Sequence, residues 1–160
     1  FARMPRPILK KINIVNVIKK SLDFIKMTSK SSINLITKDK EIFINGDEDQ
    51  LNRVFINLIK NSQEAIDEIS KKDTKFKGNI DIEIDNNNDY IVCRLTDNGS
   101  GITDPKKAMT PYFTTKKTGT GLGLPIVTKI INEHLGDFSI RNKKKGKGTI
   151  ISISLPKLNA

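Results

Sequence analysis

The sequence has little cysteine and no long apolar stretch, and both absences restrict what it can be. Cys93 is the one cysteine in 160 residues, which excludes a disulfide framework and cysteine-based zinc sites and fits a reducing compartment. No run approaches the roughly 18 apolar residues of a membrane span, and no apolar stretch behind a basic start resembles a signal peptide. We therefore expect a soluble, cytoplasmic segment without membrane contact. It lacks an initiator Met, which indicates a fragment of a longer protein.

Length and composition predict one folded domain. At 18.0 kDa, with 36% hydrophobic and 29% charged residues, the chain is large enough for a single core and too small for two full domains. Residues 1–12, with Pro5 and Pro7, are expected to form an incoming linker, because proline disfavours helix at the residue before it. The domain is then expected to occupy residues 13–160.

The net charge of +10 invites a comparison with nucleic-acid-binding proteins, and its distribution argues against one. Residues 1–30 carry eight Lys and Arg against one Asp, and residues 141–147 carry five more with no acid. The rest of the chain is close to balanced, so the excess lies in one end segment and one loop rather than along a groove. We expect no nucleic-acid partner. A basic module that binds nucleic acid or an acidic surface is the alternative from another class.

Apolar spacing predicts helices and strands along the whole chain. The longest helix begins after Asp47, a good N-cap, and Gln50 can complete a capping box with it. Its apolar stripe runs for about five turns, with Asn57, Asn61 and Glu64 on the adjoining face. The other expected elements are a helix from residue 13, strands at 33–36 and 41–44, a hairpin of strands at 80–84 and 90–95, a helix at 122–135, and strands at 137–141 and 148–155.

A glycine-rich block, Gly-Thr-Gly-Leu-Gly-Leu at residues 119–124, opens a predicted helix. Free N–H groups and the helix dipole attract anions there, and glycines let a phosphate approach the backbone. The G-x-G-x-G spacing follows a loop and differs from the dinucleotide G-x-G-x-x-G, and G-x-x-x-x-G-K-[ST] does not occur, so Rossmann and P-loop sites are excluded. Alone, the block predicts a structural turn as readily as an anion site.

Three further blocks precede it in order. Asn57 and Asn61 lie one helical turn apart, and residues 97–101, Asp-Asn-Gly-Ser-Gly, end a strand. A loop at 102–120 follows and contains residues 111–116, Pro-Tyr-Phe-Thr-Thr-Lys. Loops longer than about 12 to 15 residues in compact domains are usually functional or disordered. The combination of four blocks is far more specific than any one of them.

Together the blocks resemble the four nucleotide boxes of sensor histidine kinases: the N box at 57–61, the first G box at 97–101, the F box at 111–116 and the second G box at 119–124. The resemblance covers residues 13–156. Residues 1–5 further resemble the exit from the dimerisation helices in the NtrY-like nitrogen-regulation branch. The resemblance implies the Bergerat ATP-binding fold of the GHKL superfamily. This fold is an α/β two-layer sandwich whose mixed, mostly antiparallel sheet packs against helices, with a long loop called the ATP lid.

Residue by residue, the resemblance implies a nucleotide site with one end for the adenine base and another for the metal ion. Asp97 is similar to the family's adenine reader, a carboxylate that accepts hydrogen from the exocyclic amino group, and Gly99 and Gly101 let the backbone pass close to the base. Asn61 matches the family's Mg²⁺ ligand, and Asn57 lies one turn earlier on the same face. Both Asn residues are therefore candidates for metal binding and catalysis.

The resemblance places the residues that contact the phosphates of ATP in the lid and in the second G box. Lys116, a third catalytic candidate, or Lys117 would offset the triphosphate charge as the lid closes. Phe113 fits a core residue as well as a lid anchor. The expected contacts with ATP here also include Thr118, Gly119, Thr120, Gly121, Leu122 and Gly123.

Asn57 favours phosphoryl transfer over hydrolysis. Hydrolysing members, such as gyrase-type and chaperone ATPases, carry at the matching position a Glu that activates water, and an amide cannot take that proton. The resemblance thus implies a histidine kinase of two-component signal transduction. The γ-phosphoryl group of ATP would pass to a histidine on the kinase's own dimerisation/histidine-phosphotransfer domain and then to a response regulator receiver domain. An ATP hydrolase of the same fold is the alternative.

Two residues qualify this expectation. Glu64 stands where many family members carry a phosphate-facing Lys, so the lid lysines would have to compensate. His134, the only histidine, falls late in its helix, and we interpret it as a helix-end residue rather than a phosphoacceptor. The fragment is therefore expected to bind ATP without phosphorylating itself, as part of a membrane-anchored bacterial sensor kinase.

Overall fold

A computed structural model of the chain describes residues 4–102 and 123–158. Every helix and strand expected from the sequence within these ranges is present, and one additional strand, β1, begins inside the predicted linker. The elements are β1 (Lys10–Asn13), α1 (Ile14–Lys26), β2 (Ser32–Ile36), β3 (Phe43–Gly46), α2 (Glu48–Ser70), β4 (Asn79–Asn86), β5 (Tyr90–Asp97), α4 (Gly123–Glu133), β6 (Asp137–Asn142) and β7 (Thr149–Pro156).

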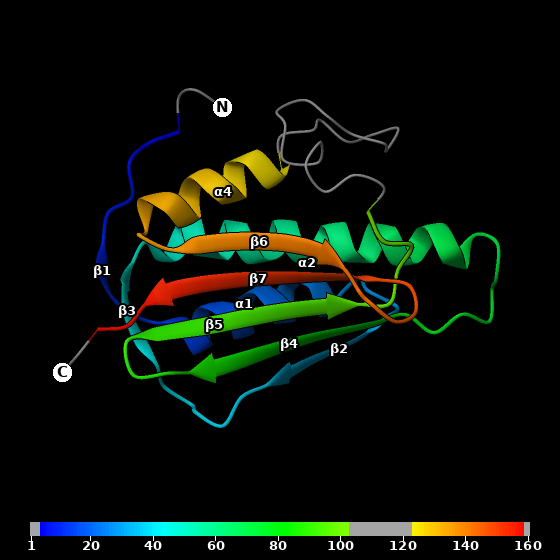
Figure 1. The fold of residues 1–160 in the computed structure, drawn as a ribbon, viewed down its shortest axis with the longest axis horizontal. Coiled ribbons are helices and arrows are strands. Elements are labelled where there is room, and N and C mark those ends of the chain that lie inside the picture. Colours follow the sequence, from blue (N-terminus) through cyan, green and yellow to red (C-terminus); the bar gives the residue numbers. More distant parts are fainter. Residues whose placement is uncertain (1–3, 103–122, 159–160) are drawn as a thin grey trace.

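Five strands form a mixed sheet in the order β2-β4-β5-β7-β6. β2 runs parallel to β4, whereas the remaining neighbours are antiparallel. The described helices α1, α2 and α4 cover one face of this sheet, as Figure 1 shows, so the described part of the molecule has two layers. The predicted two-layer α/β sandwich with a mostly antiparallel mixed sheet is confirmed.

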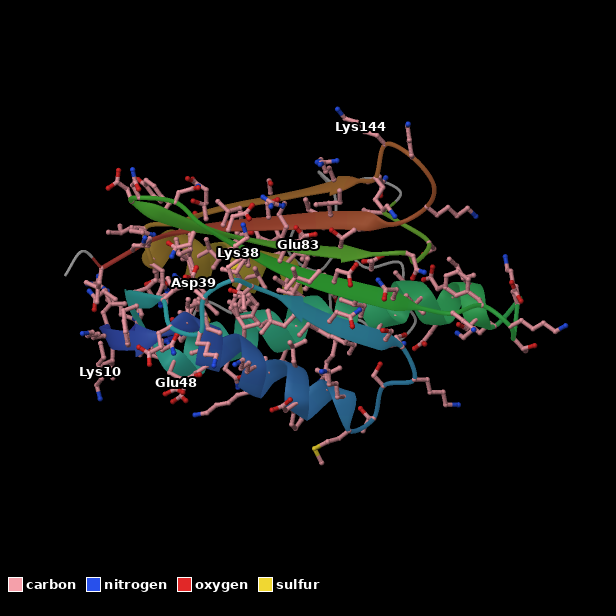
Figure 2. The ribbon with its side chains drawn as sticks, turned by 90° about the horizontal axis from the view of Figure 1, so that it is seen from below. Lys10, Lys38, Asp39, Glu48, Glu83 and Lys144 are labelled. Carbon is pink, nitrogen blue, oxygen red and sulfur yellow. The ribbon has the colours of Figure 1, made fainter. Side chains whose placement is uncertain are left out.

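The other face of the sheet is polar, because alternate residues of a strand point to opposite faces. On this face Arg94 of β5 forms ion pairs with Glu83 and Asp85 of β4. In Figure 2 the strands lie on one side and α1 and α2 on the other, with charged side chains such as Glu83 and Lys144 directed away from the core. The core therefore lies between the sheet and the helices.

Side chains from both layers fill this core. Phe55 and Leu58 of α2 and Ile82 of β4 are at most 2% exposed. Cys93 on β5 is also buried, as the alternation of its strand predicts, and burial raises the pKa of its thiol to about 12. It behaves as a small apolar side chain.

α2 begins as the sequence predicts, but its capping box is half formed. The Asp47 side chain accepts the N–H of Gln50 at 3.1 Å, which satisfies one of the free donors of the first turn. The reciprocal bond, from the Asp47 N–H to the Gln50 side-chain oxygen, is not formed, because both residues bond to distant partners instead. The Gln50 side-chain amide donates to the carbonyl of Pro5 at 2.9 Å, and the N–H of Asp47 donates to Nε2 of His134 at 3.0 Å.

β1 and β3 form a separate antiparallel ribbon, with Ile12 opposite Ile44. β3 was expected from the sequence two residues earlier, and it joins β1 rather than the five-stranded sheet. Lys10–Ile12 thus belong to a strand although they lie in the predicted linker 1–12. The boundary at residue 12 stays a prediction.

Candidate functional site

Asp97 ends β5 with its side chain inside the protein, at 2% exposure. Oδ1 accepts the N–H of Gly99 at 2.9 Å and, less closely, the N–H of Thr149 at 3.3 Å. Burial raises the pKa of Asp97 above its ordinary value, whereas these bonds, the Ser62 hydroxyl and the positive charge of Lys143 lower it. A carboxylate held inside a fold by oriented donors is a group kept for a ligand or for structure.

Ser62 and Thr149, which face Asp97, were not among the residues singled out from the sequence. Ser62 lies on the apolar stripe of α2 and is 2% exposed, and its hydroxyl faces the carboxylate of Asp97. A serine within an apolar stripe could have signalled this position. Nothing in the sequence singled out Thr149.

Two glycines of the predicted first G box shape the chain after Asp97, and one of them lets it pass α2 closely. A Cβ on Gly99 would lie 2.7 Å from both the carbonyl carbon and the Cβ of Ala65, so only glycine fits there. The N–H of Ser100 then donates to the carbonyl of Ala65 at 3.1 Å. Gly101 has φ +84°, a conformation that favours glycine. The chain after Asp97 is thereby held against α2.

The turn between β6 and β7 forms the wall on the other side. A Cβ on Gly148 would lie 2.0 Å from the carbonyl oxygen of Asp97. At the base of the same turn, Asn142 accepts the N–H of Ile102 at 2.8 Å and donates to its carbonyl at 2.7 Å. These two contacts fix the chain on both sides of Gly101.

The two asparagines of the predicted N box lie on α2, half-buried and one turn apart. Asn61 lies close to the first residue of α4: a Cβ on Gly123 would be 3.8 Å from its side-chain nitrogen. α2 and the start of α4 therefore meet at Asn61, and Figure 1 shows α4 lying along α2. The structure brings Asp97, Gly99 and Gly101 to one flank of α2 and Asn61 and Gly123 together.

Several predicted site residues fall outside the part of the chain that the structure describes. They are Lys116, Lys117, Thr118, Gly119, Thr120, Gly121 and Leu122, together with Phe113. Their roles stay predictions.

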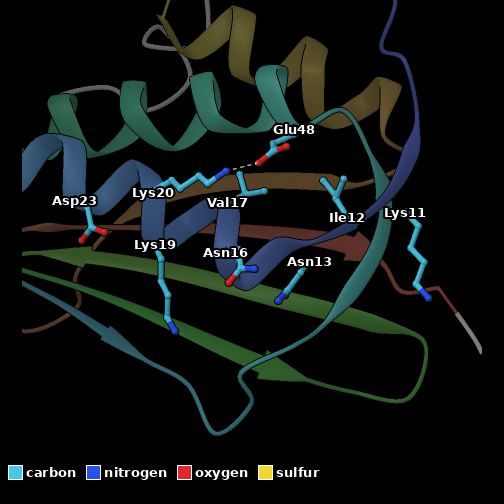
Figure 3. A pocket seen from close by; sticks show the side chains of 9 residues that line it. All are labelled: Lys11, Ile12, Asn13, Asn16, Val17, Lys19, Lys20, Asp23 and Glu48. Atoms are coloured by element: carbon cyan, nitrogen blue, oxygen red, sulfur yellow. Dashed lines mark hydrogen bonds and ion pairs between the residues drawn. The ribbon is translucent and has the colours of Figure 1, made fainter.

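A hollow on α1 involves none of the predicted residues. It has a volume of about 370 Å³ and lies over α1 and β1, where Lys11, Lys19 and Lys20 share it with Asp23 and Glu48 (Figure 3). Lys20 and Glu48 form an ion pair at 3.1 Å, with side chains 72% and 49% exposed. Exposed charges of both signs are typical of a solvated surface.

His134 is a buried structural residue, as we interpreted it from the sequence. It follows α4 directly, is 4% exposed, and accepts from Asp47 at Nε2 while Nδ1 contacts the carbonyl of Ile130 at 2.8 Å. The Ile130 carbonyl requires a proton on Nδ1, which leaves Nε2 as the acceptor. Both ring nitrogens have partners.

Comparison with known proteins places this geometry in a family. Residues 46–159 match the family model of histidine kinase-, DNA gyrase B- and HSP90-like ATPases. The chain belongs to this ATPase family. The predicted resemblance to the catalytic domain of sensor histidine kinases is confirmed.

Relatives of this ATPase domain carry kinase names. A putative NtrY-like sensor histidine kinase of Rickettsia conorii is 35% identical over 156 residues, which cover 96% of this chain and 25% of that protein. The chain thus spans about a quarter of the length of this curated relative. The NtrY-like resemblance of residues 1–5 points to the same branch.

Solved structures share the fold. The catalytic domain of the histidine kinase ThkA has a TM-score of 0.79 and 26% identity, and the match covers 94% of this chain and 96% of that one. The mycobacterial sensor histidine kinase MprB has a TM-score of 0.80 at 20% identity, with 96% of this chain and 100% of that one covered.

Residues 4–102 and 123–158 hold no group of three or more His, Cys, Asp and Glu that could bind a metal ion. Within the same ranges, no helix combines the length and apolarity of a membrane span.

Proposed function

We propose that this domain binds ATP with Mg²⁺ and transfers the γ-phosphoryl group to a histidine on the dimerisation domain of a sensor kinase. The observation that carries the proposal is the buried carboxylate of Asp97, beside the buried hydroxyl of Ser62, between α2 and the β6–β7 turn. A carboxylate is an acceptor that suits an exocyclic amino group. Adenine offers such a group and guanine offers a carbonyl at that position.

The metal end of the site rests on amide oxygens. Mg²⁺ prefers oxygen ligands and keeps several waters and substrate phosphates, so one or two protein oxygens suffice. Asn61 and Asn57, half-buried on α2, fit that requirement. When bound, Mg²⁺ would neutralise charge that develops on the phosphates. The start of α4 at Gly123, beside Asn61, supplies free N–H groups for the same phosphates.

In the proposed transfer, a nitrogen of the acceptor histidine forms a bond to the γ-phosphorus while the bond to the β,γ-bridging oxygen breaks and ADP leaves. The residues of this chain contribute by positioning and charge neutralisation, because the nucleophile comes from elsewhere. His134 is buried with both nitrogens engaged and is no candidate acceptor.

An ATP hydrolase of the same fold is the second candidate, and Asn57 argues against it. An amide cannot remove a proton from water, so we expect intrinsic turnover below about 1 per second. The partners of the kinase are its own dimerisation/histidine-phosphotransfer domain and a response regulator receiver domain. Its location is the cytoplasmic side of a membrane-anchored sensor kinase.

Titration with a non-hydrolysable ATP analogue, with and without Mg²⁺, tests this function. We expect binding that Mg²⁺ strengthens and that the matching GTP analogue does not reproduce. Calorimetry that detects no heat from the ATP analogue in either condition would remove the proposal. A turnover of several molecules of ATP per second by the wild-type chain would instead favour the hydrolase.

A further inference from the structure

Five residues from three parts of the chain meet at the start of α2. Asp47 is the centre, Pro5 and Ile8 come from the incoming chain, Gln50 from the first turn of α2, and His134 from the end of α4. We call this set the Asp47 junction. α4 runs from the junction at His134 back to Gly123 beside Asn61, so the junction and the candidate nucleotide site lie at opposite ends of one helix.

The incoming chain is bonded to the junction at two points. The N–H of Ile8 donates to Oδ2 of Asp47 at 2.8 Å, and the Gln50 side-chain amide donates to the carbonyl of Pro5 at 2.9 Å. Met4 packs against the core and is half-buried. Residues 4–9 therefore follow a defined path across the domain.

α4 is bonded to the same residue. The N–H of Asp47 donates to Nε2 of His134 at 3.0 Å, and the His134 ring is tied to the carbonyl of Ile130, one turn back in α4, at 2.8 Å. Asp47 thus links three segments: Oδ2 holds the incoming chain, Oδ1 caps α2 through Gln50, and the main-chain N–H holds the end of α4.

The charge of Asp47 is suited to this role. Burial raises the pKa of Asp47, but the hydrogen bonds from the N–H groups of Ile8 and Gln50 outweigh it, so the pKa lies below its ordinary value. The side chain is therefore ionised near neutral pH, and both oxygens are acceptors. Charge-assisted bonds of this kind are stronger than neutral ones.

We propose that Asp47, with Gln50 and His134, is a positioning site that fixes residues 4–9 to α2 and α4 and thereby sets the orientation of the nucleotide site toward the domain that precedes it. The inference rests on the proposed function, because the acceptor histidine is placed on that preceding domain. A fixed approach raises the rate of a transfer between two bodies by limiting their relative motion. Among the described residues, the junction forms no hydrogen bond to Asp97 or Gly99, so we expect it to act on transfer and to leave ATP affinity unchanged.

Asp47→Asn is the variant that separates the two roles of Asp47, capping α2 and holding the incoming chain. Asparagine is as good an N-cap as aspartate, so α2 keeps its cap, but its one carbonyl oxygen cannot serve both Gln50 and Ile8. We expect hydrogen exchange at the Ile8 amide to accelerate about tenfold or more, with exchange inside α2 unchanged. Asp49→Asn is the matched control, since it removes the same charge from an exposed position in the first turn of α2. Unchanged exchange at Ile8 in Asp47→Asn overturns the inference.

The second measurement uses the full-length kinase. Asp47→Asn and Gln50→Met, which removes the donor to Pro5, should lower kcat for phosphorylation of the acceptor histidine about tenfold while the KM for ATP stays at the wild-type value. Asp49→Asn should leave both constants unchanged. A rise in KM without a fall in kcat, or wild-type kcat in both variants, overturns the inference.

The two proposals fail in different ways. If the wild-type chain binds no ATP analogue, both the proposed function and this inference are disproved. If the wild-type kinase transfers phosphate normally, and the variants release Ile8 but transfer phosphate equally fast, only the positioning role is disproved.

Discussion

The main-chain N–H of Thr149 donates to Oδ1 of Asp97 at 3.3 Å, although 52 positions separate the two residues. The N–H of Gly99 donates to the same oxygen at 2.9 Å. Because two donors converge on Oδ1, we expect the amino group of a bound adenine to use Oδ2. The bond also ties the end of β5 to the start of β7, so the orientation of the carboxylate is fixed before a ligand arrives.

Replacing Asp97 with asparagine should separate binding from stability. Asparagine keeps an oxygen for the N–H groups of Gly99 and Thr149 but can present its NH₂ to the amino group of adenine, so affinity for the ATP analogue should fall at least about tenfold. The free energy of unfolding of the ligand-free protein should rise, because burial disfavours the charge of Asp97. Calorimetry and urea unfolding measure the two effects. Asp137→Asn, at an exposed position, is the control.

Acid should weaken nucleotide binding through the same residue. The raised pKa of Asp97 means that it takes up a proton at a higher pH than an ordinary carboxyl with a pKa of 3.8. The protonated group is a poorer acceptor, so affinity falls as the pH drops through this raised pKa. The contribution of Asp97 to folding has the opposite sign: it is fully present below 3.8 and is lost as the pH rises through the folded-state pKa. Binding by Asp97→Asn should lack the acid-dependent loss in titrations over a pH series.

Asn61→Ala should remove the contribution of Mg²⁺ to ATP binding. Loss of an amide ligand is expected to lower affinity in Mg²⁺ about tenfold or more, whereas affinity in EDTA stays near the wild-type value. Asn132→Ala, on the exposed face of α4, serves as the comparison. If the Asn61 variant still gained affinity on addition of Mg²⁺, the metal assignment would be wrong.

Gly99→Ala should destabilise the fold where the chain passes α2. The added methyl would lie 2.7 Å from atoms of Ala65, part of them backbone, so we expect a loss of about 1–3 kcal/mol in the free energy of unfolding. Gly146→Asn is the contrast: φ is +74°, which Asn tolerates, and no atom lies within 4 Å of the added carbon. Equal stability of the two variants would contradict the close contact.

Cys93 should resist alkylation in the native protein. It is 3% exposed and its thiol has a pKa of about 12, so thiolate is scarce at neutral pH and the reagent has no access. Iodoacetamide followed by mass spectrometry should show modification in urea and none in buffer. Rapid labelling in buffer would place Cys93 outside the core.

Periodic patterns in the sequence predicted most of the helices and strands, but they could not predict hydrogen bonds between distant residues. The alternation along β5 predicted that Cys93 is buried, and the stripe of α2 predicted its buried face. Asp47 shows the limit: its sequence neighbours predicted a capping box with Gln50, but His134, 87 positions away, takes its N–H. Local spacing contains no information about such a partner.

The sequence likewise predicted some residues of the candidate site and missed others. Asp97, Gly99 and Asn61 belong to blocks with a recognisable spacing, so the sequence identified them. Ser62 was visible as a polar residue within an apolar stripe, but its neighbour Asp97 is supplied by a separate strand. Thr149 acts through its main-chain N–H, which any residue other than proline has, so its side-chain type carried no signal.

The parallel pairing of β2 with β4 has a consequence for how the molecule assembles and comes apart. Asn34 and Asp81, which are bonded across this pair at 2.9 Å, are 47 positions apart, and all of α2 lies between them. β2 has a single neighbour at the edge of the sheet, so it gains its hydrogen bonds only after a long loop has closed. It should therefore dock late in folding and detach early under denaturant, which opens the segment around residues 30–40 to proteases in a partly unfolded molecule.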